Sequence, residues 1–135
     1  VMASVQAVSV SQIADKTYIY DFGQNLSGVA SLTLTGEAGQ TVKLRFAEML
    51  NDASGTGDGR EGTLYTQNLR SAKNTDVYIL RGDAEGETWY PTLTYRGFRY
   101  VEISGIAEPL PTGAVTARVL YTEMEDTGSF DALRR

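Results

Sequence analysis

The sequence predicts an all-β protein, an antiparallel β-sandwich or jelly roll. Apolar and polar residues alternate with a period of two along most of the chain, as in strands with one buried face. Short glycine-containing turns, such as 35–41 and 81–87, separate many of the alternating segments, and helical periodicity is nearly absent. Short strands joined by regular turns favour a sandwich, although nothing in the pattern distinguishes it from a closed barrel.

About eight strands are expected. In order, they lie within residues 5–10, 17–22, 31–36, 41–50, 76–82, 87–95, 98–105 and 114–123. The first two are rich in valine, isoleucine and tyrosine, which favour strands. In the third, Leu32 and Leu34 alternate with hydroxyl side chains, and in the fourth Leu44 lies between Lys43 and Arg45. The third and fourth segments therefore each have one face suited to solvent and one apolar face.

The later strands have less clear patterns. Within 76–82, Val77 and Ile79 share one face while Tyr78 and Leu80 share the other, and we assign the first pair to the core. Pro91 lies inside a further expected strand and indicates an edge or a bulge, because proline cannot donate to a neighbouring strand.

The apolar side of each alternation predicts the core. The residues expected to be mostly buried are Leu32, Leu34, Val42, Leu44, Phe46, Val77, Ile79, Val101, Ile103, Val115 and Val119. Only 66–73 and 130–135 have a sequence that could form a turn or two of helix.

Composition excludes several kinds of chemistry. The 135 residues suffice for one domain, and the chain contains no cysteine and no histidine. Disulfides, thiol nucleophiles and Ser-His or Cys-His triads are therefore unavailable, and no metal or other cofactor is expected. The net charge of −5 disfavours nucleic-acid binding. No apolar run reaches membrane-spanning length, and 1–15 lacks the basic start of a signal peptide.

The stretch "DFGQN" at 21–25 has no evident chemistry. We interpret it as a strand end followed by a turn, in which Gly23 supplies a permissive backbone and Asn25 bonds locally before Gly28 opens the next strand. A phosphate-binding loop is disfavoured because no helix follows the glycines.

The segment 51–74 is too long for a hairpin loop, and long ordered loops tend to be functional or interfacial. Its first half contains Asn51, Asp52 and Asp58, oxygen ligands of the kind that calcium binds, but their spacing does not fit an EF-hand. A cation and a plain flexible loop both stay open. Its second half carries Leu64, Tyr65 and Leu69, and we expect that half to pack on its own sheet or on another domain.

Two further sets of residues are candidates for sugar chemistry. Paired carboxylates for glycoside hydrolysis could come from Asp21, Glu48, Glu61 and Asp76, although each is expected to be a solvated or strand-end charge. A sugar-stacking platform could come from Trp89, Tyr90, Tyr95 and Tyr100, for which packing within the sheets is the favoured alternative.

Four ordered blocks resemble a known family. They are "DFGQN" with a glycine three residues later, "G..G..V.LR.AE.L", "LYT.NLR.A..TD.Y.L.G" and "P.....GFRYVE..G". Together they resemble the concanavalin-like β-sandwich domain of bacterial α-L-rhamnosidases, glycoside hydrolase family 78, over about residues 5–130.

The resemblance implies one sandwich domain spanning 1–135, with 128–135 as the start of a linker toward an (α/α)6 catalytic domain that this chain lacks. The parent enzyme would hydrolyse terminal α-L-rhamnosyl linkages with inversion. No catalytic residue can be assigned within the chain, which is expected to be inactive by itself and to lie in a bacterial protein of undetermined compartment.

Two functions remain open. The first is an accessory domain that packs on the catalytic domain, and the second is a module that binds rhamnose-containing glycans. Candidate ligand-binding or interdomain residues are Tyr65, Asn68, Arg70 and Trp89. If 62–76 instead folds back on its own sheet, Arg70 is expected to meet a carboxylate such as Asp76.

Overall fold

The computed structural model describes residues 1–132 and confirms an all-β, antiparallel fold. The strands are β1 (Ala3–Gln6), β2 (Ser9–Ala14), β3 (Thr17–Leu34), β4 (Thr41–Ala47), β5 (Met49–Leu50), β6 (Leu64–Tyr65), β7 (Thr75–Ile79), β8 (Glu87–Trp89), β9 (Arg96–Ser104) and β10 (Val115–Val119). Two single turns of 3-10 helix, η1 (Gln67–Leu69) and η2 (Thr112–Ala114), complete the described elements.

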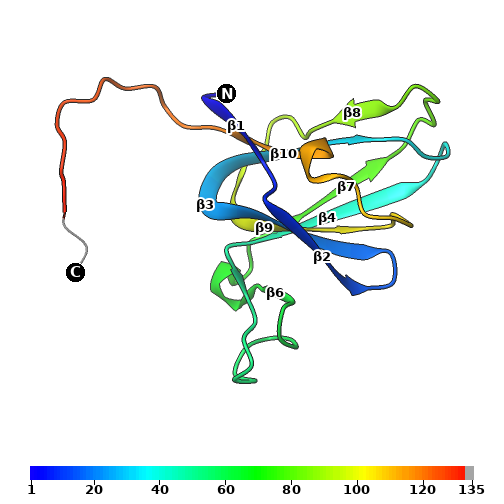
Figure 1. The fold of residues 1–135 in the computed structure, drawn as a ribbon, viewed down its shortest axis with the longest axis horizontal. Helices are drawn as coiled ribbons and strands as arrows, with labels where there is room; N and C mark the ends of the chain where they lie inside the picture. Colours follow the sequence, from blue (N-terminus) through cyan, green and yellow to red (C-terminus); the bar gives the residue numbers. More distant parts are fainter. Residues whose placement is uncertain (133–135) are drawn as a thin grey trace.

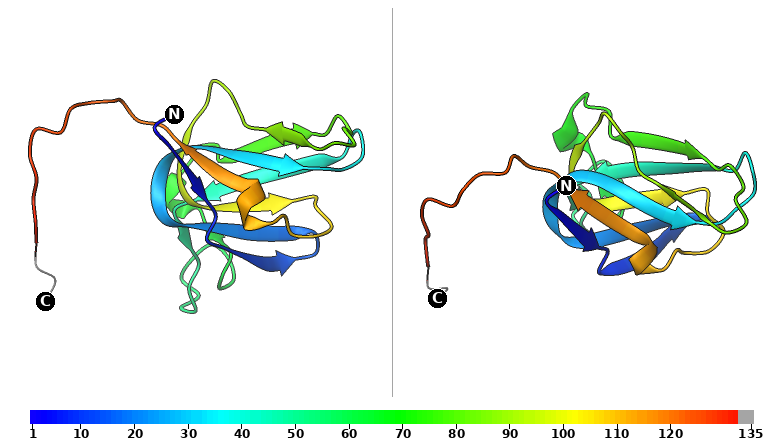
Figure 2. Two further views of the ribbon diagram at one scale, coloured as in Figure 1. Left: turned by 45° about the horizontal axis from the view of Figure 1, so that its top comes forward. Right: turned by 90° about the horizontal axis from the view of Figure 1, so that it is seen from above.

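The long strand β3 takes part in both layers of the fold. Its first part, 17–21, pairs with β2 on one side and β9 on the other, and β9 continues to β4 and β7. Its last part, 28–34, pairs with β10 and β8, and β10 continues to β1. Between these parts β3 curves strongly at one end of the molecule (Figure 1), and the two layers face each other (Figure 2).

The bend corrects the interpretation of "DFGQN" as a turn between two strands. Between Asp21 and Leu26 the chain advances five residues, while the paired strand β9 advances only two, from Phe98 to Tyr100. The three extra residues of β3 interrupt the regular pairing but do not end the strand, as in a β-bulge. Gly23 adopts φ 77°, and its N–H donates to Asp21 Oδ1 at 2.7 Å. The expectation of permissive backbone at Gly23 is thus confirmed, although no strand ends there.

One core fills the space between the layers. Phe98 contacts Phe22 and Phe46 edge to face, with ring centroids 5.6 and 5.1 Å apart. At the far edge, Tyr78 of β7 stacks on Trp89 of β8 at 4.9 Å, which joins the outermost strands of the two layers. Within 1–132, no buried side-chain nitrogen or oxygen lacks a hydrogen-bond partner. The sandwich therefore completes its core with its own strands.

Most of the predicted core residues are buried, but Val77 and Ile79 are not. They are 55% and 59% exposed, whereas Leu80 on the opposite face is 2% exposed. Both faces of β7 are apolar, so alternation alone could not choose between them. Tyr78 decides the choice, because it packs on Trp89 and donates its hydroxyl hydrogen to Glu87 inside the domain. Val119, also predicted buried, is partly buried against the core.

The expected strand at 87–95 is shorter than predicted. β8 ends at Trp89, before Pro91, and pairs only with β3, which agrees with an edge strand. The expected helical turn within 66–73 is confirmed as η1. For 130–135, residues 130–132 have no regular structure, and 133–135 lie outside the described residues.

A buried carboxylate closes the turn between β7 and β8. Glu87 is 2% exposed, and its oxygens accept from the Tyr78 hydroxyl and from the backbone N–H groups of Arg81, Gly82 and Asp83. These donors, the Tyr78 hydroxyl first, lower the pKa of Glu87 from 4.5 to about 2. Hydrogen bonds to the ionised form offset the cost of burying it.

We expect Glu87→Gln to destabilise the domain at neutral pH and to change its response to acid. A carboxyl whose pKa is lower in the folded state stabilises above its unfolded pKa and loses that contribution as the pH falls toward the folded value. The gap in unfolding free energy between wild type and variant should therefore narrow between about pH 4.5 and 2. Urea denaturation across this range tests it, with the exposed Glu85→Gln as the control for charge. A gap independent of pH would contradict this role.

Gly28 of β3 lies directly opposite Val119 of β10 and leaves no room for a side chain. A Cβ there would lie 2.1 Å from the carbonyl oxygen of Arg118 and 3.2 Å from the Cα of Val119. Gly28→Ala should therefore force two backbones apart and lower the unfolding free energy by roughly 2–4 kcal/mol. Ser27→Ala, at the neighbouring exposed position, is the matched control for chemical denaturation. Equal stability of the two variants would show that the strands separate without cost.

Candidate functional site

The loop 51–74 folds back over the outer face of the β2–β3–β9–β4–β7 layer. Leu64 is 4% exposed and packs with Ile19 and Ala47, on the opposite side of the layer from the main core. β5 and β6 pair as the base of this loop. The expected packing of its second half is thus found, and for Leu64 the partner is the domain's own sheet.

Asn51 organises the loop from inside. Its amide Nδ2 lies 3.0 Å from Asp58 Oδ1, 3.0 Å from Thr63 Oγ1 and 3.1 Å from the carbonyl oxygen of Leu64. The other oxygen of Asp58 accepts from the backbone N–H and hydroxyl of Thr66, which lower the pKa of Asp58. The amide nitrogen of Asn51 donates to the Asp58 carboxylate, and its oxygen accepts from the backbone N–H of Asp58 at 3.2 Å, so both ends of this amide are used in hydrogen bonds within the loop. Among residues 1–132, no group of three or more acidic, histidine or cysteine side chains is placed to hold a metal.

Glu48 joins two distant parts of the chain. Its Oε1 accepts from Nδ2 of Asn25 at 3.0 Å, and its Oε2 accepts from Nδ2 of Asn68 at 2.9 Å. We call these three residues the Glu48 junction. Asn25 lies in the β3 irregularity and Asn68 lies in η1, so the carboxylate ties both segments to the end of β4. Three of the four motif blocks in the sequence meet here.

The fourth block meets the first through an ion pair. Nε and Nη2 of Arg99 donate to Oδ1 and Oδ2 of Asp21 at 2.8 and 2.9 Å. This two-point contact lowers the pKa of Asp21, which the N–H of Gly23 lowers further, and the same contact raises the pKa of Arg99. Bidentate arginine–carboxylate pairs fix geometry as well as charge. The pair therefore fixes the start of the β3 irregularity against β9.

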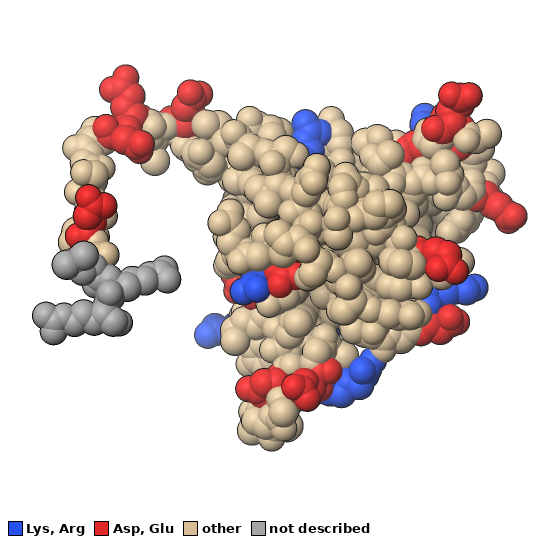
Figure 3. Space-filling view, viewed as in Figure 1, with Lys and Arg blue, Asp and Glu red and all other residues tan. Residues whose placement is uncertain are grey.

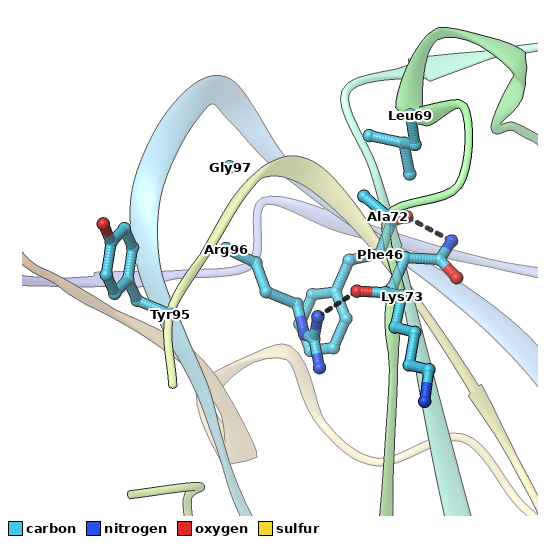
Figure 4. A pocket seen from close by; sticks show the side chains of 8 residues that line it. Phe46, Leu69, Ala72, Lys73, Tyr95, Arg96 and Gly97 are labelled. Atoms are coloured by element: carbon cyan, nitrogen blue, oxygen red, sulfur yellow. Dashed lines mark hydrogen bonds between the residues drawn. The ribbon is translucent and has the colours of Figure 1, made fainter. Parts of the chain in front are cut away.

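A second arginine is held beside the loop. The guanidinium of Arg96 pairs with Asp76, donates to the carbonyl oxygen of Lys73 and lies 5.3 Å from the ring centroid of Phe46. Figure 4 shows this arginine between Phe46 and the backbone of Lys73 in a hollow that Leu69 also lines. The expected pairing of Arg70 with Asp76 is wrong, because Arg96 occupies that carboxylate. Arg70 follows η1 with φ 53° and is exposed.

The four carboxylates considered for hydrolysis have separate surroundings. Asp21 and Asp76 are paired with arginines, and Glu48 accepts from two amides. Glu61 is exposed on the loop. A general acid needs a carboxyl that stays protonated near neutral pH, whereas the pKa of Asp21 is lowered. The arrangement serves cohesion of the domain.

The predicted interdomain residues do not share one exposed patch. Tyr65 is half-buried in a hollow beside Met49 and Asn68, and Asn68 belongs to the Glu48 junction. Arg70 is exposed, while the Trp89 ring is stacked on Tyr78 inside the domain. Among the aromatic candidates, Tyr100 is half-buried with Arg99 over its ring at 5.0 Å, and Tyr90 lies under Arg118. Tyr95 is 70% exposed.

The arrangement defines an all-β module whose polar motif side chains pair with one another. The family described as the bacterial alpha-L-rhamnosidase concanavalin-like domain matches residues 11–121, and the chain belongs to this family.

An alpha-L-rhamnosidase of Streptomyces avermitilis is 42% identical over 125 residues, which are 93% of this chain and 11% of that protein. Its crystal structure, complexed with L-rhamnose, matches 89% of the chain with a TM-score of 0.79. The native Aspergillus terreus enzyme is 34% identical and matches 92% of this chain and 13% of that one, with a TM-score of 0.78. The chain thus spans about a tenth of these relatives. Among the described residues, no helix has the length and apolar character needed to cross a membrane.

Glu48→Ala should release both segments that the Glu48 junction holds. Loss of two hydrogen bonds to a charged acceptor at a partly exposed site is expected to cost roughly 1 kcal/mol. Amide hydrogen exchange should quicken at 23–25 and 66–70. Glu61→Ala, which removes an exposed carboxylate from the same loop, is the control. If exchange changes only near residue 48, the two segments are held by other contacts.

Proposed function

We propose that this domain is a non-catalytic accessory sandwich of an α-L-rhamnosidase and packs against the catalytic domain of its parent enzyme. The observation that carries the proposal is that Asp21, Asp76 and Glu48 are all engaged by the domain's own cations and amides. The short share of the relatives that this chain matches supports it, because about nine-tenths of the Streptomyces protein lies elsewhere.

The parent enzyme, in this proposal, hydrolyses terminal α-L-rhamnosyl linkages. The relatives matched over most of this chain are alpha-L-rhamnosidases, which supports that substrate class. Residues 121–132 are exposed and lie outside the sandwich, which supports a role of 128–135 as the start of a linker; 133–135 lie outside the described residues.

Binding of a rhamnose-containing glycan is the less favoured role. A stacking platform needs exposed aromatic faces, and the Trp89 face is used by Tyr78 while Arg118 lies 3.8 Å from the ring centroid of Tyr90. Tyr95 remains an exposed aromatic side chain in this region, in a hollow that Ser27 and Thr122 also line.

We expect the isolated chain to fold and to leave an aryl α-L-rhamnoside unhydrolysed, because its candidate carboxylates are tied in structural contacts. The full-length parent enzyme, assayed at the same molar concentration, is the positive control. Titration of the chain with L-rhamnose by calorimetry tests the glycan-binding alternative in the same preparation. Turnover above a mock-purified sample would overturn the non-catalytic role, and an inactive parent would overturn the assignment to a rhamnosidase.

A further inference from the structure

Exposed apolar side chains gather where the chain leaves the sandwich. We call this surface the exit face and define it by Val1, Tyr90, Leu93, Tyr95, Leu120 and Tyr121. Two adjoining hollows make it up, and Leu120 lines both of them. Val1, Tyr95 and Tyr121 are 65%, 70% and 64% exposed. A contiguous apolar surface of this kind on a folded domain marks a contact with another protein surface.

Leu93 has two unfavourable features at once. It is fully exposed, although leucine gains most from burial, and its φ of 62° lies in the left-handed region that non-glycine residues avoid. The structure of the isolated sandwich contains nothing that offsets either. A strained backbone that presents an apolar side chain to the outside is favourable only if that side chain meets a partner.

The exit face is firmly attached to the core despite its exposure. The N–H of Leu120 donates to the carbonyl oxygen of Ser27 at 2.8 Å, which extends the β10–β3 pairing beyond Val119. The N–H of Met2 donates to the carbonyl oxygen of Val119 at 2.8 Å, so the first residues lie beside the last strand. The hollows are therefore built beside paired strands and on the 90–95 loop.

Charge is scarce on this surface. Arg118 lines one of the hollows, where its guanidinium covers the Tyr90 ring, and no other Lys, Arg, Asp or Glu lines either hollow. In Figure 3 the acidic side chains gather on the extended tail and at the right-hand and lower ends of the body. A partner of apolar character fits this surface better than a charged one.

We propose that the exit face, which includes Leu93, is the surface on which the following part of the parent chain docks. The inference rests on the proposed function. In Figure 1 the tail after β10 departs from this corner of the sandwich. A domain attached there starts at high effective concentration next to the exit face. Relatives about nine times longer than the matched segment have ample chain to cover it.

The test compares Leu93→Gly in the chain 1–135 and in the full-length parent enzyme. Glycine removes the strain at positive φ and removes no contact from the isolated sandwich, so the melting temperature of the chain should change by no more than about 2 °C. In the full-length enzyme the same change removes an apolar contact. The transition that contains this domain should fall by about 4 °C or more, and amide exchange at 92–95 should quicken.

Lys16→Gly is the matched control, because Lys16 is exposed and has φ 51° in the turn between β2 and β3, away from the exit face. Lys16→Gly should change the melting temperature equally in the chain 1–135 and in the full-length enzyme.

The proposal is overturned if Leu93→Gly also changes the melting temperature equally in both proteins, or if it lowers that of the isolated chain by several degrees. It is also overturned if the isolated chain sediments as a dimer that Leu93→Gly dissociates, because the occupant is then a second copy. If amide exchange is slower in the full-length enzyme than in the isolated chain at 65–70, and not at 92–95, the docking surface is the one that carries Tyr65 and Arg70. None of these outcomes depends on whether the parent is a rhamnosidase, which its activity decides.

Discussion

The bend of β3 is the constraint on which the rest of the structure depends. A strand that pairs in both layers must turn through the edge of the sandwich without losing its partners, and β9 follows it on both sides of the bend. The chain meets this demand with surplus residues between Asp21 and Leu26 and with a missing side chain at Gly28. Bulges commonly provide such changes of direction, because they increase local twist.

Polar side chains from the four motif blocks hold the bend of β3 in place from outside the core. Asp21 is held by Arg99 of β9, and Asn25 is held by Glu48, which in turn holds Asn68. Each contact joins segments that are at least 20 residues apart in sequence. The order of the blocks along the chain therefore reflects a set of long-range contacts around one bend. Their chemistry is that of positioning, and the pairing with Arg99 lowers the pKa of Asp21.

The sequence predicted the strands of the two layers better than it predicted the polar contacts that hold the bend of β3. Alternation identified Val42, Leu44 and Phe46 correctly, because their neighbours on the strand are charged. It failed at Val77, where both faces of β7 are apolar and a stack between Tyr78 and Trp89 across the two layers decides the orientation. The Glu48 junction could not be found from spacing, since nothing local brings residues 25, 48 and 68 together. The sequence likewise could not predict that Arg96, rather than Arg70, pairs with Asp76, because that choice depends on the fold.

The two kinds of surface on this domain have different consequences for its function. The polar motif residues are satisfied by one another, so they add rigidity but leave few hydrogen-bonding groups for a partner. The apolar residues of the exit face are mostly exposed in the isolated sandwich and lie just beyond the ends of strands or on the 90–95 loop. A rigid scaffold loses little conformational freedom when a neighbour docks on it, so a modest apolar contact can fix two domains relative to each other. In the proposed docking, the rigidity of the β3 bend fixes the orientation of the neighbouring domain relative to this one.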